Sequence, residues 1–164
     1  MITEKVENEQ TGQKEYTVLV AVDFSQCSAQ ALRKAKSIMG IKPDRILILH
    51  VIDENFVERC ITDQIGTKKD IKKTLFRQAR NRLKEFLRSE GMEGEPVEEL
   101  ICEGTPFLEI NKKAVETGAD MVIMGNRGTS GDMQTIFFGS TAERVLRFMK
   151  RPVLCVPVEE DRKE

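Results

Sequence analysis

One glycine-rich segment, residues 125–140, combines the residue types that bind phosphate groups. It follows a strand-like apolar run at 120–124 and ends in a hydroxyl pair, Ser140 and Thr141, where a helical pattern begins. Glycines directly after a strand let backbone amides approach a ligand closely, and the first amides of a helix have no acceptor within the helix. The segment therefore predicts a phosphate-binding loop.

A second candidate, Asp23, directly follows another apolar run at 16–22. Near-continuous apolar runs are typical of parallel strands that are buried on both faces. In doubly wound sheets, ligands bind at the carboxyl ends of the strands, at the point where the strand order reverses. We therefore expect Asp23 to face the glycine segment. The alternative is structural, since an aspartate here can accept backbone N–H groups in the following turn.

Strand-like and helical patterns alternate along the rest of the chain. Strands are predicted at 16–22, 46–52, 97–102, 120–124 and 153–158, and helices at about 28–39, 68–90, 106–117 and 140–149. Five strands with four intervening helices predict an α/β fold with a doubly wound parallel sheet and right-handed crossovers. We expect one domain over residues 16–158, with a flexible tail at 1–15 and a charged tail at 159–164.

Residues 53–66 lack a clear period and are too long for an ordinary connection between a strand and a helix, so they predict a lid, a binding loop or a mobile segment. The helix that follows has an apolar stripe that includes Leu75, Ala79 and Leu83. Its lysines and arginines are interpreted as a solvated face. His50, the only histidine, is interpreted as a core or edge residue rather than a catalytic base.

Composition restricts the function classes. Lysine and arginine number 26 and aspartate and glutamate 27, and this net charge of −1 does not favour a surface that binds nucleic acid. No run of 18 apolar residues predicts a membrane span, and no apolar signal region is recognisable near the N-terminus. Four cysteines without paired spacing favour neither disulfides nor zinc, which predicts a cytoplasmic location.

Several short motifs, taken together, resemble the universal stress protein family over about residues 16–158. The matching segments are Val20-Ala21-Val22-Asp23, Gly104-Thr105-Pro106, Val122-Ile123-Met124-Gly125-Asn126-Arg127-Gly128, Gly139-Ser140-Thr141 and Arg151-Pro152-Val153-Leu154-Cys155-Val156-Pro157. The resemblance implies a three-layer, adenine-nucleotide α-hydrolase-like fold with strand order 3-2-1-4-5. It also implies a homodimer that pairs through the fifth strand at 153–158, where Pro157 lacks one backbone donor.

The resemblance further implies a ligand: ATP, with ADP or AMP as alternatives, with or without Mg²⁺. Asp23 with its two predecessors would lie beside the adenine and ribose, and the backbone of one second-strand residue would contact the base. The glycine segment would line the ribose and the phosphates, and the last glycine with the hydroxyl pair would hold the terminal phosphates. In order, these residues are Ala21, Val22, Asp23, Val51, Met124, Gly125, Arg127, Gly128, Gly139, Ser140 and Thr141.

The spacing of the glycines departs from the family pattern by one residue. Gly125 and Gly128 fit the pattern of the ATP-binding branch, but ten residues rather than nine separate Gly128 from Gly139. An outward bulge in the loop would keep Gly139 beside the phosphates, because glycine in the loop tolerates unusual backbone angles. A shifted Gly139 would instead close the phosphate site. The chain would then be a dimeric interaction protein that binds no nucleotide.

Catalysis has less support than binding. The chain has neither the lysine-containing P-loop motif nor the glycine pattern of dinucleotide-binding proteins. No histidine lies near the glycine segment in sequence, no carboxylate pair for magnesium is evident, and Asp132 would meet a metal only if the loop folded inward. With the resemblance, we therefore expect a nucleotide-dependent stress-response or signalling protein, and the resemblance alone implies slow ATP hydrolysis as a further alternative.

Overall fold

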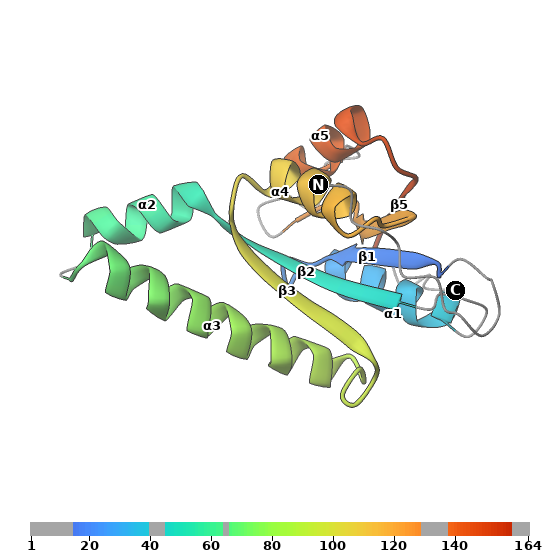
Figure 1. Ribbon diagram of the computed structural model, residues 1–164, viewed down its shortest axis with the longest axis horizontal. Coiled ribbons are helices and arrows are strands. Elements are labelled where there is room, and N and C mark those ends of the chain that lie inside the picture. Colours follow the sequence, from blue (N-terminus) through green and yellow to red (C-terminus); the bar gives the residue numbers. More distant parts are fainter. Residues whose placement is uncertain (1–14, 40–44, 64–65, 129–137, 159–164) are drawn as a thin grey trace, which may run out of the picture.

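A computed structural model describes residues 15–39, 45–63, 66–128 and 138–158 of the 164-residue chain. The predicted tails at 1–15 and 159–164 lie outside these ranges, apart from Glu15. So do residues 129–137 of the glycine segment. Figure 1 shows the arrangement of the helices and strands in the described ranges.

Five parallel strands form one sheet in the order β3-β2-β1-β4-β5, as predicted. The central strand β1 pairs with β2 on one side and with β4 on the other, so the strand order reverses beside β1. Several strands begin or end one or two residues from the predicted positions. Their bounds are Thr17–Ala21 for β1, Arg45–Asp53 for β2, Val97–Gly104 for β3, Met121–Gly125 for β4 and Val153–Val156 for β5.

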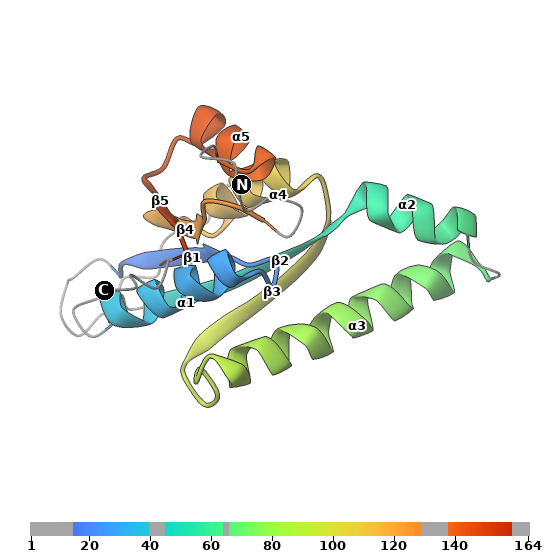
Figure 2. The ribbon, with the colours of Figure 1, turned by 180° about the vertical axis from the view of Figure 1, so that it is seen from behind.

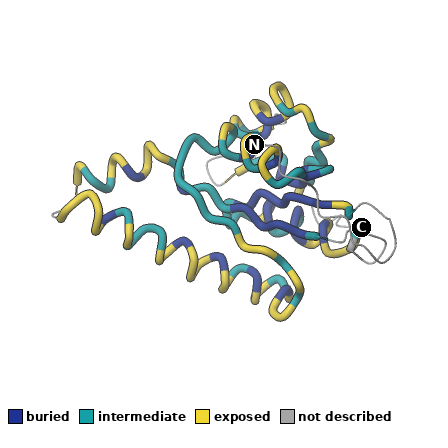
Figure 3. Tube along the Cα trace, viewed as in Figure 1, coloured by how far each residue is buried: buried dark blue, intermediate teal, exposed yellow. Residues whose placement is uncertain are grey.

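Helices cover both faces of the sheet and make three layers (Figures 1 and 2). Helices α1 (Gln26–Met39) and α3 (Lys68–Ser89) pack on one face, where Leu32 and Leu83 join Ile48 of β2 in one apolar core. Helices α4 (Pro106–Glu116) and α5 (Ser140–Phe148) pack on the other face, where Ile110 and Val145 lie against β1 and β4. All five residues of β1 are buried, which accounts for its continuous apolar sequence (Figure 3).

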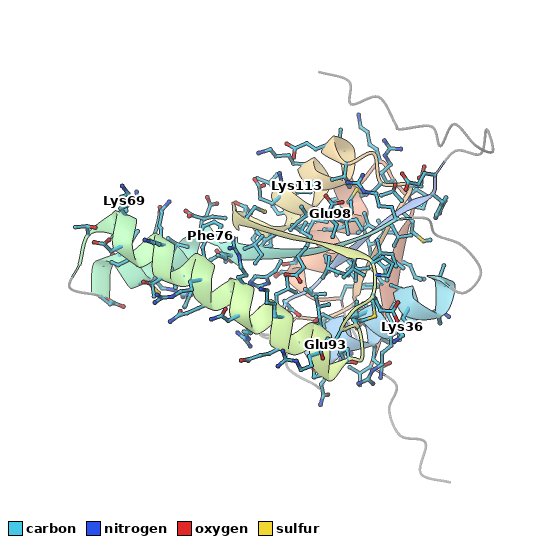
Figure 4. All side chains as sticks on the ribbon, turned by 60° about the horizontal axis from the view of Figure 1, so that its bottom comes forward. Lys36, Lys69, Phe76, Glu93, Glu98 and Lys113 are labelled. Atoms are coloured by element: carbon cyan, nitrogen blue, oxygen red, sulfur yellow. The ribbon has the colours of Figure 1, made fainter. Side chains whose placement is uncertain are left out.

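The prediction of a loop at 53–66 is wrong for most of that segment, because Glu54–Asp63 forms a helix, α2. A lid role for this segment stays a prediction. This helix and the first half of α3 make a hairpin that extends away from the sheet (Figure 1). Lys69 lies near the end of the hairpin, and Phe76 lies further along α3, nearer the sheet (Figure 4). Val57 is the buried residue of α2, and Ile61, one turn later, packs on the same small core.

Apolar and polar contacts connect this hairpin to the sheet. Val57 of α2 and Ala79 of α3 pack with Ile52 of β2 in a small separate core. The Lys72 ammonium lies 2.6 Å from a carboxylate oxygen of Glu103 at the end of β3. A further hydrogen bond joins the Thr105 hydroxyl to the Glu54 carboxylate. The hairpin is therefore fixed beside the carboxyl ends of β2 and β3, where a ligand site is expected.

The first glycine of the segment, Gly125, is required by packing. A Cβ atom at this position would lie 2.5 Å from Cys27 Cβ and 2.8 Å from the Cys27 carbonyl carbon. We expect Gly125→Ala to push α1 away from β4 and to lower the free energy of unfolding by about 1–3 kcal/mol. For a chain of this size, each kcal/mol lowers Tm by about 2–4 °C, which calorimetry measures directly.

Cys27→Ala provides the matched control. It removes only the sulfur atom and leaves the Cβ and the backbone that the new methyl group would meet. The double variant Cys27→Ala/Gly125→Ala should therefore remain as unstable as Gly125→Ala. Recovery of stability in the double variant would contradict this packing account.

Candidate functional site

A cavity of about 830 Å³ lies at the carboxyl ends of β1, β2 and β4. Its walls come from both faces of the sheet and include residues of α3 and the first turn of α5. The structure brings all the predicted site residues to this one cavity; their contacts with a ligand stay a prediction. They are Ala21, Val22, Asp23, Val51, Met124, Gly125, Arg127, Gly128, Gly139, Ser140 and Thr141.

Asp23 and the glycine segment meet, although 105 positions separate Asp23 from Gly128 in the sequence. A Cβ atom at Gly128 would lie 2.8 Å from Oδ2 of Asp23, so only a residue without a side chain leaves this carboxylate in place. The backbone of Gly128 therefore forms one side of the cavity directly opposite an acidic group.

The two ends of the glycine loop are also joined. The Gly139 amide donates a hydrogen bond of 2.9 Å to the Asn126 carbonyl oxygen. A Cβ atom at Gly139 would lie 3.2 Å from Arg127 Cα and 3.3 Å from the Gly128 nitrogen. The longer interval between the glycines thus leaves Gly139 in contact with Gly128. The residues at 129–137, where an outward bulge was considered, lie outside the described ranges.

The first turn of α5 contains both residues of the hydroxyl pair. Serine and threonine are common N-cap residues, but Gly139 is the N-cap residue here and no side chain makes a capping hydrogen bond. Ser140 and Thr141 lie in the first turn and line the cavity. The amides of that turn have no acceptor within the helix, and together with the helix dipole they favour a negatively charged group. The site thus has an anion-binding side.

The turn after β1 holds the Asp23 carboxylate in place. Its Oδ1 atom accepts a hydrogen bond of 3.0 Å from the Ser25 amide, so the structural role considered for Asp23 is confirmed. Between them, Phe24 has a φ angle of 66°, which is unusual for a bulky residue. The strained backbone places the Phe24 ring 4.3 Å from the ring of His50. Strain of this kind is concentrated at functional sites.

Sequence reasoning missed the wall that α3 contributes. Gln78 and Arg82, one helical turn apart, both line the cavity. The Arg82 guanidinium lies 4.5 Å from the centre of the Phe24 ring. Gln78 and Arg82 are exposed, so this face is solvated as interpreted, and it also forms part of the cavity wall. Only the arrangement of α3 over the ends of the strands reveals the wall, because the helical pattern is the same as that of an ordinary exposed face.

His50 lines the same cavity as the glycine segment, although the two are far apart in the sequence. Its Nδ1 atom lies 2.9 Å from the Val22 carbonyl oxygen, which can only accept; Nδ1 therefore carries the proton and Nε2 is an acceptor. Burial lowers the pKa of His50, and the charge of Arg82 acts in the same direction. The Val22 hydrogen bond and the charge of Asp23 oppose this shift.

The described residues contain no cluster of three or more histidine, cysteine or acidic side chains that would hold a metal ion. Asp132, considered in the sequence as a conditional metal ligand, lies outside the described ranges. All four cysteines are free thiols. Burial raises the pKa of Cys102 to about 11, and the nearby Glu109 carboxylate adds to this shift. The thiol of Cys102 is thus protonated at neutral pH and is a poor nucleophile.

Comparison with known proteins agrees with this geometry. The model of the universal stress protein family matches residues 16–157. The chain belongs to the universal stress protein family. It is 29% identical over 151 residues to the universal stress protein MJ0577 of Methanocaldococcus jannaschii, covering 85% of this chain and 93% of that protein. A Thermus aquaticus universal stress protein is 30% identical over 146 residues, covering 85% of this chain and 97% of that protein.

Solved structures of universal stress proteins share the fold. The structure of MJ0577 superposes with a TM-score of 0.74 and covers 88% of this chain and 97% of that one. A universal stress protein in complex with cAMP has a TM-score of 0.54 at 23% identity, with coverage of 88% and 98%, and shows the fold alone. Within the described ranges, no helix has the length and apolar character needed to cross a membrane.

The lowered pKa of His50 makes stability depend on pH. Between the folded pKa and the ordinary value of about 6.5, the unfolded chain binds more protons than the folded chain, so stability falls as pH decreases below about 6.5. We expect the wild type to lose this part of its stability between pH 7.5 and about pH 5. Denaturant titrations across this range measure the free energy of unfolding.

His50→Gln provides the control, because glutamine does not titrate and its amide can still donate to the Val22 carbonyl. Acid effects from other groups act on both proteins. As pH falls, the free energy of unfolding of the wild type should therefore decrease more than that of His50→Gln. A difference that stays constant with pH would contradict the assignment of a neutral, buried His50.

Proposed function

We propose that this universal stress protein binds an adenine nucleotide in the cavity and acts as a nucleotide-dependent signalling module in the cytoplasm. ATP is the first candidate, with ADP, AMP and cyclic AMP as the other ligands to test. The cyclic nucleotide is included because a protein of the same fold was solved in complex with cAMP. The observation that carries the proposal is the contact between Asp23 and Gly128 at the point where the strand order reverses.

The two sides of the cavity have complementary chemistry for a nucleotide. Asp23 keeps Oδ2 directed towards Gly128, and a carboxylate at this place suits the hydroxyl groups of a ribose. Val51 and Met124 line the cavity, where the backbone of Val51 would contact the base. On the other side, Gly128, Gly139 and the first turn of α5 present amides to the phosphates.

The proposal includes a homodimer that forms through β5, which lies at the edge of the sheet. The carbonyl groups of Pro152 and Val156 accept hydrogen bonds from the β4 side. Because neighbouring residues of a strand alternate in direction, the backbone groups of Val153 and Cys155 point to the free edge. An unpaired strand edge of this kind is suited to pairing with a second copy. Pro157 ends the row of available donors.

Nucleotide binding is tested by isothermal titration of dialysed protein with ATP and Mg²⁺. We expect Asp23→Asn to weaken binding at least about tenfold, or about 1.4 kcal/mol, because asparagine keeps the Ser25 hydrogen bond but loses the charge. Asp63→Asn is the control, since Asp63 is exposed at the end of α2 and does not line the cavity. Absence of heat with each of the four nucleotides at millimolar concentration would refute the proposal and favour a nucleotide-free interaction protein.

A glycine substitution separates binding from stability. In Gly128→Ala the new methyl group displaces the flexible end of Asp23 rather than backbone. We therefore expect weaker nucleotide binding with little change in Tm, in contrast to Gly125→Ala. A Gly128→Ala protein that binds ATP like the wild type would show that the position of Asp23 does not control affinity.

The dimer is tested by light scattering on a sizing column. Cys155→Pro removes a donor on the free edge of β5 without removing a hydrogen bond to β4, so we expect the molar mass to fall from two chains to one. Cys155→Val removes the thiol and keeps the backbone donor, and it should remain a dimer. Dimers of equal stability in both variants would place the interface elsewhere.

A further inference from the structure

Residues on both sides of the carboxyl end of β2 line the cavity. Alternate β2 residues face opposite sides of the sheet: Val51 packs with the core under α4 and α5, whereas Ile52 packs with α2 and α3. His50 points to the α3 side, where it contacts Phe24. We call the part of the cavity beside α3 the second arm; its wall includes Phe24, His50, Leu75, Gln78 and Arg82.

The proposed nucleotide does not account for the second arm. None of the residues proposed to contact the nucleotide comes from α2 or α3, yet Phe56, Leu75 and Gln78 line the same cavity. The whole cavity, about 830 Å³, lies towards the upper end of the roughly 300–1,000 Å³ that small-molecule sites occupy. The second arm therefore offers space for a ligand in addition to the proposed nucleotide.

Polar groups of the second arm are arranged for an anion. Arg82 lies over the Phe24 ring, and within the described ranges no carboxylate forms an ion pair with it. A guanidinium held over an aromatic ring keeps its N–H fork for a planar carboxylate. Gln78, one turn earlier on the same face, adds amide donors. Both donors thus lie along one wall.

Other groups in the wall restrict the ligand to one negative charge and an apolar body. His50 is neutral, so Arg82 is the one positive charge among the residues named for the second arm. Leu75 and Phe56 supply apolar surface, and Phe56 is 46% exposed although it is a large aromatic residue. Burial of this surface would favour an aromatic or aliphatic group.

We propose that the second arm binds a small organic monoanion, with its carboxylate against Arg82 and Gln78 and its apolar body against Leu75 and Phe56. The site would let the protein respond to such an acid beside the nucleotide. This inference rests on the proposed function in one respect: the nucleotide, placed as proposed, must leave the second arm vacant. Binding of the acid can be tested in the absence of nucleotide.

Saturation-transfer NMR on the full chain tests the inference with phenylacetate and indole-3-acetate. The matched probes are phenylacetamide and indole-3-acetamide, which keep the apolar body and lose the charge. We expect the carboxylates to bind with Kd of about 1 mM or tighter, and the amides to bind at least about tenfold more weakly. No signal from either carboxylate at about 10 mM would overturn the inference, as would equal binding of acids and amides.

Two arginine variants locate the site. Arg82→Gln should weaken carboxylate binding at least about tenfold. Arg80→Gln, on the same helix and equally exposed but outside the cavity, should bind like the wild type. Equal binding by both variants, each checked for an unchanged Tm, would overturn the inference. Wild-type protein that binds the carboxylates but none of the nucleotides would refute the proposed function alone, whereas wild-type protein that binds a nucleotide but neither carboxylate would overturn this inference alone.

Discussion

The close approach of Gly128 to the Asp23 carboxylate is the constraint on which the site depends. It joins the ends of β1 and β4, two strands that are neighbours in the sheet but distant in the sequence. Gly125 serves a different purpose, since it lets α1 pack against β4, and Gly139 closes the loop onto Asn126. Three glycines of one motif thus have three distinct physical roles: helix packing, space for a carboxylate, and loop closure.

The α2–α3 hairpin contributes residues to one side of the cavity, and the glycine loop forms another side. It is held at the sheet by the Lys72–Glu103 ion pair and by the small core around Ile52. This position brings Arg82 over the ring of Phe24, which also lies beside the ring of His50. Aromatic and cationic groups that support one another in this way are pre-organised, so less entropy is lost when a ligand binds.

Much of the fold followed from the sequence, because buried parallel strands and amphipathic helices have clear periods. The apolar run of β1 and the stripe of α3 through Leu83 are examples. Helix α2 was missed because it is only ten residues long and follows β2 without a break, so its short apolar stripe through Val57 and Ile61 was not recognised. Arg82 was missed for another reason: its pattern is that of an exposed helix face, and only tertiary packing places it beside Phe24.

A crystal structure of the protein grown with ATP is the most direct test of the account. We predict electron density for the ribose beside Asp23 and for phosphates at Gly128, Gly139 and the first turn of α5, with the second arm free of nucleotide. Nucleotide density that lies away from both Asp23 and Gly128, or a cavity without density under saturating ATP, would contradict the central claim.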